Sequence, residues 1–139
     1  MSINADFNSI DLKKALDLFP KNVQKNIMIG ATRAAAAQLR DDIREATPIR
    51  TGNLRKSIGV NKRRSPSKTM TWYSVSPRQG GRHDGFYGRF LEFGTVKMSP
   101  RPFMRPAFEA KGERGIDAFF DYAKNRVDGE TVKARHGRS

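Results

Sequence analysis

Hydrophobic residues recur with helical spacing near the start of the chain. Over residues 21–46, apolar side chains return every three or four positions, which predicts one long amphipathic helix. Pro48 ends this helix, because proline disfavours helical backbone at the residue before it. A shorter amphipathic helix is expected over residues 9–19, with Ser9 as its N-cap.

The middle of the chain has the pattern of strands and loops. Polar and apolar residues alternate over residues 58–60, and residues 70–76 are rich in β-branched and aromatic side chains. The two segments are therefore expected to pair as a hairpin. Residues 61–68, which are basic, and residues 78–85, which are rich in glycine, are expected to be extended loops. For the aromatic residues 86–93, the pattern allows either a strand or a helix.

A final helix is expected from about Pro106, a residue that suits the first turn, to residue 125. The prolines of residues 101–106 bar an ordinary helix interior, which predicts a rigid turn that anchors Phe103. Residues 126–139 carry little apolar surface, so they are expected to form a flexible basic tail.

These elements predict an α+β fold, in which a long N-terminal helix and a C-terminal helix pack on a small, mainly antiparallel sheet with extended basic loops. A length of 139 residues allows one ordinary domain, expected over residues 1–125. Charged residues interrupt every apolar stretch, so no membrane span is expected. The first residues have neither a basic nor an apolar signal region, which favours a protein that stays in the cytoplasm where it is made.

The positive charge is concentrated in the middle of the chain. The formal net charge is +13, and residues 50–105 hold thirteen basic and two acidic side chains, while the flanks are nearly balanced. A polyanion or an acidic protein surface is therefore an expected partner. The candidate partner contacts in these basic loops are Lys62, Arg63, Arg64, Lys68, Arg78 and Arg82. Because Trp72 and Tyr73 lie among them, independent nucleic-acid binding is an alternative function.

The residues that support catalysis or cofactor binding are few. The chain has no cysteine, which excludes disulfides, thiolate metal sites and thiol nucleophiles. His83 and Asp84 form half of a hydrolase constellation without an obvious third partner. The glycines of residues 80–85 are not followed by the helix and Lys-Ser or Lys-Thr pair of a phosphate-binding loop. We therefore expect no enzymatic activity, no metal and no cofactor.

Three short motifs occur in order along the chain. The long helix runs into Pro48 and the block Thr51-Gly52-Asn53-Leu54, then comes Glu92-Phe93-Gly94-Thr95, and then Arg101-Pro102-Phe103-Met104-Arg105-Pro106-Ala107. This order resembles the HK97 gp10-like family of tailed bacteriophages. The motif positions are Pro48, Thr51, Gly52, Leu54, Glu92, Gly94, Thr95, Arg101, Pro102, Phe103 and Pro106.

The resemblance implies a structural virion protein of the phage neck or tail, with no catalytic activity. Such a protein is expected to form a homo-oligomeric ring at the head–tail junction, as a head–tail connector or tail completion protein. A hexamer would match the sixfold tail, and a twelvefold ring stays open. Its expected partners are connector or adaptor proteins and tail tube or terminator proteins. Contact with genomic DNA is also left open, and the protein would be in the host cytoplasm during assembly.

Physical roles can be assigned to several motif positions. Gly52 is expected to form a tight turn in a conformation closed to side chains. Glu92 is surrounded in sequence by arginines and lysine, so a structural ion pair is expected there. Phe103 is expected to fill the core or to contact a neighbouring subunit. For all motif positions, folding and subunit contact are the two interpretations.

Overall fold

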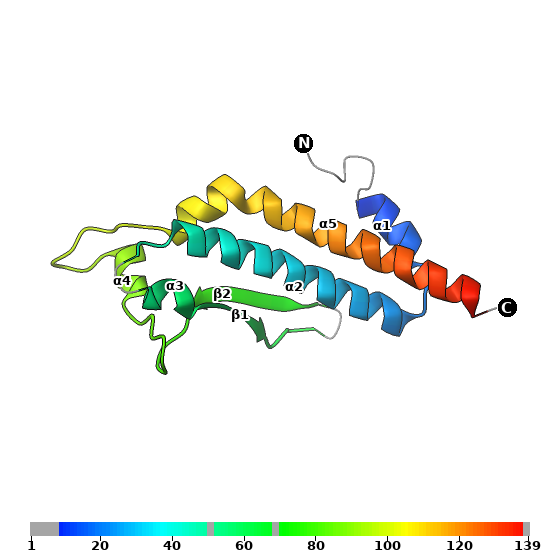
Figure 1. Cartoon of the computed structure of the whole chain (residues 1–139), viewed down its shortest axis with the longest axis horizontal. Helices are drawn as coiled ribbons and strands as arrows, with labels where there is room; N and C mark the ends of the chain where they lie inside the picture. The colour runs from blue at the N-terminus through cyan, green and yellow to red at the C-terminus, as the bar shows by residue number, and fades with distance from the viewer. Residues whose placement is uncertain (1–8, 50–51, 68–69, 138–139) are drawn as a thin grey trace.

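A computed structural model describes residues 9–49, 52–67 and 70–137, and two long antiparallel helices dominate it (Figure 1). The elements are α1 (Ser9–Leu16), α2 (Lys21–Ala46), α3 (Asn53–Ser57), β1 (Ile58–Arg63), β2 (Trp72–Pro77), α4 (Gly88–Phe93) and α5 (Met104–His136). Helix α2 lies between α5 on one side and the β1–β2 hairpin on the other (Figure 1). This arrangement confirms the predicted α+β fold with its small antiparallel sheet.

Helix α2 ends where the sequence predicts. Thr47 has extended backbone, with φ −72° and ψ 130°, as expected for the residue before Pro48. Its hydroxyl donates a hydrogen bond of 2.6 Å to the carbonyl oxygen of Ile43, which satisfies an acceptor of the last turn. In the first half of α2, the ring of Tyr122 from α5 lies directly on Gly30, where a Cβ atom would overlap it. The two long helices therefore approach each other closely.

Two hydrophobic clusters hold the elements together. The first joins α1, α2 and α5 through Leu12, Leu16, Ile27, Ala31, Ala123 and Val127. The second lies at the other end of α2 and consists of Ile43, Leu54, Ile58, Phe103 and Ala107. A buried charge lies on α2, where Asp42 accepts from Arg114 at 3.0 Å and from Gln38 at 3.2 Å. The second cluster contains residues from the first and the third motif.

The expectation for the C-terminal segment is wrong, because α5 continues eleven residues past position 125 to His136. Val127 is buried in the first cluster and anchors this part of the helix. Glu130 then forms ion pairs with Arg126 at 3.5 Å and with Lys133 at 3.2 Å. Extending an existing helix costs far less than starting one, so one anchor and side-chain pairs are enough.

The loop expected over residues 61–68 is also shorter than predicted, because β1 extends to Arg63. The hairpin register pairs Ile58 with Pro77 and Arg63 with Trp72. Arg63 also donates a hydrogen bond of 2.8 Å to the hydroxyl of Ser74 on β2. Lys62 and Arg63 are thus strand residues. An exposed hairpin can carry basic side chains, so this part of the strand shows no alternation of apolar and polar residues. The undecided segment, residues 86–93, contains the helix α4.

Candidate functional site

The first motif forms the short helix α3. Gly52 precedes this helix with φ 79°, in the left-handed region that favours glycine. Leu54 is buried in the second cluster, and its side chain lies against Gly88 of α4, where a Cβ atom would be 2.8 Å from it. Pro48 is exposed, and Thr51 lies outside the described residues. The motif therefore connects α2, β1 and α4.

Glu92, from the second motif, caps the helix that the third motif begins. One carboxylate oxygen accepts from the backbone N–H groups of Phe103 and Met104 at 2.8 and 2.9 Å, and the other accepts from that of Arg105 at 2.9 Å. An α-helix leaves its first four N–H groups without partners, and the fourth position here is Pro106, which has no N–H. Glu92 and Pro106 together therefore leave no donor of this helix end unsatisfied.

The environment of Glu92 favours its charged form. Burial alone raises the pKa of this carboxyl, but the N–H donors of Met104, Arg105 and Phe103 and the charge of Arg105 outweigh burial and lower the pKa below its ordinary value. A negative charge at a helix N-terminus also complements the helix dipole. The expected side-chain ion pair is not found, because none of the ion pairs between described residues includes Glu92. Backbone donors hold this carboxylate instead.

The chain after Glu92 turns back sharply toward α5. Gly94 has φ 75° and ψ 176°, a region closed to residues with a side chain, and a Cβ atom there would lie 2.9 Å from the carbonyl oxygen of Met98. Thr95 and Met98 form an isolated bridge, and the Arg101 N–H donates to the carbonyl oxygen of Leu91 at 2.6 Å. These contacts bring Glu92 within reach of the start of α5. The side chains of Arg101, Pro102 and Pro106 are exposed.

Replacing Gly94 by alanine should lower the free energy of unfolding by about 2 kcal/mol, because the Cβ atom meets backbone and the conformation is strained. Thermal or urea unfolding measures this loss. Gly52→Ala is the first control, since its φ is also positive but no atom lies within 4 Å of its Cβ position. Gly129→Ala is the second control. Its Cβ atom lies in open space on α5, so the free energy of unfolding should rise by about 0.5 kcal/mol. Equal losses at Gly94 and Gly52 would show that the contact with Met98 contributes nothing.

The three motifs meet in one place. Phe103 is buried in the second cluster beside Leu54, and its N–H group is held by Glu92. The first motif therefore contributes a core side chain, the second a carboxylate, and the third the helix start that both of them position. Leu54, Glu92 and Phe103 therefore form one folding unit at this end of the molecule, whereas the side chains of several other motif positions are exposed.

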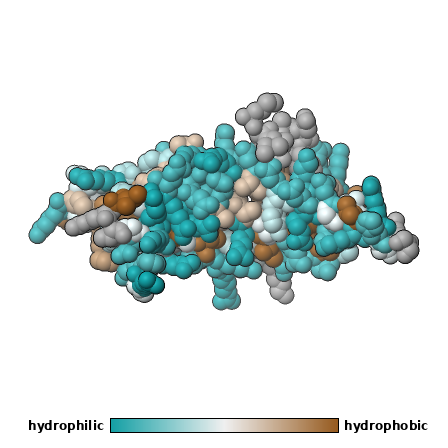
Figure 2. Space-filling view, in the orientation of Figure 1, coloured by the Kyte–Doolittle hydropathy of each residue, from teal (hydrophilic) through white to brown (hydrophobic). Residues whose placement is uncertain are grey.

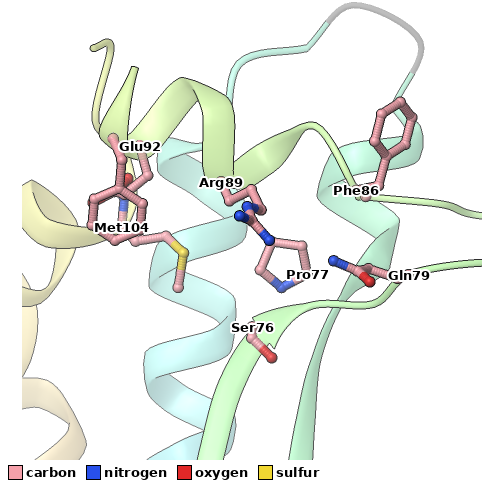
Figure 3. Close-up of a pocket in the computed structure, with 9 residues that line it drawn as sticks. Ser76, Pro77, Gln79, Phe86, Arg89, Glu92 and Met104 are labelled. Carbon is pink, nitrogen blue, oxygen red and sulfur yellow. The ribbon is translucent and has the colours of Figure 1, made fainter. Parts of the chain in front are cut away.

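A surface hollow lies beside this unit. It has a volume of about 350 Å³ and runs between β2, α4 and the start of α5. Figure 3 shows the lining residues Phe86, Arg89, Glu92 and Met104, with Pro77 between Arg89 and Ser76. A second hollow, of about 910 Å³, shares Phe86 with the first and continues along the other side of α4. Phe86 thus stands between two largely apolar hollows.

Large apolar side chains are exposed around these hollows. Phe93 is 74% exposed and Phe86 54%, and Val96 is fully exposed. Phe90, which lines the second hollow, and Ile49, next to its lining residue Pro48, are also exposed; we call these five residues the α4 end. Figure 2 shows hydrophobic residues at the tip of the molecule where α4 and the following loop lie. Exposed apolar side chains beside apolar hollows are typical of interaction sites.

The six candidate basic residues are divided by the structure. Lys62 and Arg78 line one hollow between α2 and the hairpin, whereas Arg63 and Arg64 lie exposed at the far end of β1. Arg82 is exposed in the glycine-rich loop, and Lys68 lies outside the described residues. The hollow also contains three arginines of α2 that the sequence analysis did not single out, namely Arg33, Arg40 and Arg44. Their spacing of seven and four residues on one helix face is the signal that would have identified them.

The residues considered for catalysis have structural partners. The His83 ring lies 3.3 Å from the Asn53 side-chain oxygen, and the Asp84 carboxylate accepts from the Phe86 N–H at 2.9 Å. Within the described ranges, no three metal-binding side chains gather in one place. Nor does any described helix combine the length and the apolar character needed to cross a membrane.

Comparison with known protein families identifies the chain. Residues 10–94, more than half of the sequence, match the model of a family described as "Bacteriophage HK97-gp10, putative tail-component". The chain belongs to the HK97-gp10-like family. It is accordingly a bacteriophage protein with a structural role in the tail, a component of the virion that interacts with other phage proteins. No curated protein and no solved structure matches it.

The match to the HK97-gp10-like family covers the first motif and the second as far as Gly94, leaving out Thr95. The third motif and α5 follow it, but Glu92 lies inside the match and caps α5. The family region therefore includes the residue that positions the helix outside it.

Proposed function

We propose that the chain is a structural protein of the phage neck that joins or completes the tail at the head–tail junction. It assembles as a ring, with six copies to match the sixfold tail, and binds connector or adaptor proteins on one side and tail tube or terminator proteins on the other. It acts inside the virion after assembly in the host cytoplasm. The role is architectural and uses no catalytic chemistry.

The observation that carries this proposal is the α4 end. Phe86, Phe93 and Val96 place exposed apolar surface beside two hollows, and burying such surface is the main driving force of subunit association. One copy supplies the projecting side chains and the next supplies a different surface, so the contact is heterologous. A heterologous contact closes into a ring when its rotation is a whole fraction of a turn.

The position of the α4 end relative to the core supports the same role. Glu92 and Phe103 fix the start of α5 directly behind it, so the exposed side chains stand on a rigid base. A preformed surface loses little conformational entropy on binding. Membership of a phage tail family supplies the biological setting.

A double variant, Phe93→Ser with Val96→Ser, should be monomeric under conditions where the unchanged protein forms a multimer. Light scattering after size exclusion measures the mass. Leu18→Ser is the matched control, because Leu18 is 84% exposed on the segment between α1 and α2, away from α4, and its loss should leave the multimer intact. A monomer at every concentration, together with absence of the protein from the neck in electron micrographs of particles, would overturn the proposal. An unchanged mass for the double variant would exclude the α4 end as the contact.

A further inference from the structure

The hollow between α2 and the hairpin is lined by five cations. Arg33, Arg40 and Arg44 lie on one face of α2, Lys62 comes from β1, and Arg78 follows β2. The hollow has a volume of about 380 Å³, and no carboxylate is among the described residues that line it. Its remaining lining residues are Ala37, Gly59, Val60 and Tyr73.

Two of these cations are held in place by neutral backbone. The Arg44 guanidinium donates to the carbonyl oxygen of Ile58 at 3.0 and 2.6 Å. The Arg78 guanidinium lies on Gly59, where a Cβ atom would be 2.7 Å from its Nε. Neither a carbonyl oxygen nor a glycine cancels the charge of the cation beside it. Arg40 does have an acidic neighbour, the exposed Asp41 at 3.0 Å. The hollow therefore keeps a strong positive field.

We infer that this hollow binds the sugar-phosphate backbone of double-stranded DNA. Arg44 follows Arg33 by eleven residues, which at about 1.5 Å per residue separates them by about 16 Å along α2. Phosphates of one DNA strand repeat about every 3.4 Å along the duplex axis, so this row of cations spans about five of them. The guanidinium fork also matches the geometry of phosphate oxygens.

The cations form a row rather than a single point, and this favours a polymer with regularly repeated charge. Lys62 and Arg78 add two cations on the hairpin side of the same hollow. Tyr73 is opposite Lys62 in the hairpin register and also lines the hollow, so an aromatic side chain accompanies the charges. An isolated phosphate or carboxylate would engage only one part of this surface.

This inference goes beyond the joining role. Binding to the phosphate backbone needs only one copy of the chain, so it does not depend on the ring. If the ring lies at the head–tail junction, the packaged genome is the DNA that the hollow meets.

The test compares the unchanged protein with a triple variant, Arg33→Ala, Arg40→Ala and Lys62→Ala, which leaves the two anchored arginines in place. Fluorescence anisotropy with a labelled 30-base-pair duplex, repeated over a series of salt concentrations, gives the affinity. Removing three phosphate contacts should reduce the slope of log affinity against log salt by about 2.7. Between about 50 and 200 mM salt, the unchanged protein should therefore lose roughly fortyfold more affinity than the triple variant. The matched control removes three exposed cations elsewhere, Lys14, Lys124 and Arg135, and should bind almost normally.

Three outcomes would overturn the inference. In the first, the unchanged protein shows no binding at low salt. In the second, the control loses as much affinity as the triple variant, which would reduce the effect to net charge. In the third, the triple variant would lose binding to a polyglutamate peptide while keeping its affinity for DNA, which would assign the hollow to an acidic protein surface. Light scattering on the same samples separates this test from that of the ring, since the triple variant should keep the unchanged mass. Its melting temperature should also stay unchanged.

Discussion

Replacing Phe103 by alanine should lower the free energy of unfolding by about 3–5 kcal/mol. The side chain is only 3% exposed and packs with Leu54 and Ile58, so its removal leaves a cavity in the second hydrophobic cluster. Small domains have about 5–15 kcal/mol of stability in total, so this single change should remove a large part of it. The melting temperature should fall by about 10–20 °C. Urea unfolding, monitored by far-ultraviolet circular dichroism, measures the loss.

Phe108 offers a matched control for this experiment. It lies five residues further along α5 and is 59% exposed, so Phe108→Ala removes the same atoms from a position that is mostly in water. Its expected cost is below about 1 kcal/mol. A similar loss for the two variants would mean that Phe103 is not the core contact of the third motif, and that the motif serves subunit contact instead.

The sequence predicts the regular parts of this fold because their patterns are local. The apolar spacing of residues 21–46 and the proline at position 48 define α2 without reference to the rest of the chain. The alternation and β-branched residues of the hairpin are likewise sufficient to indicate two paired strands. The left-handed turn at Gly52 follows from the residue type and its place after a helix.

The end of α5 could not be predicted in the same way. Residues 126–136 have few apolar positions, and a composition argument treats them as a separate segment. Their helical structure depends on Val127, which packs in the cluster that also contains residues of α1 and α2. Two of these residues, Leu12 and Leu16, lie more than a hundred positions before Val127 in the sequence. Such a contact appears only when the helices are already placed.

The candidate site shows a similar division. The motif order identifies the residues of the site. It does not show that Glu92 accepts hydrogen bonds from three backbone N–H groups eleven to thirteen residues later. The neighbouring arginines make an ion pair the obvious expectation, and backbone donors leave no mark on a sequence. The sequence analysis missed three cations of the hollow between α2 and the hairpin, because Arg33, Arg40 and Arg44 lie on a helix with a small net charge. Charge counted along the chain does not show which side chains the fold brings together.

Glu92→Ala should lower the free energy of unfolding by about 3 kcal/mol. The change removes a charged acceptor from three N–H groups at the start of α5, and hydrogen bonds to charged groups are worth more than neutral ones. The melting temperature should fall by about 10 °C, and protection of the first-turn amides of α5 from hydrogen exchange should fall with it. Glu109→Gln, at an exposed position of α5, is the control and should change stability by less than about 0.5 kcal/mol.

The pH dependence of Glu92→Gln tests the charge separately from the hydrogen bonds. The pKa of Glu92 lies below its ordinary value in the folded protein, so the folded state holds the carboxylate in its charged form. Its contribution is therefore fully present above the ordinary carboxyl pKa of about 4.3 and is lost as the pH falls through the lower folded value. The pKa of Glu45 is also lowered, first by its hydrogen bond to Lys111 and then by the charge of Lys111, and both proteins share that effect. The difference in free energy of unfolding between the unchanged protein and Glu92→Gln should thus be constant near neutral pH and shrink below about pH 4. A difference that stays constant into acid would show that the charge of Glu92 does not stabilise the start of α5.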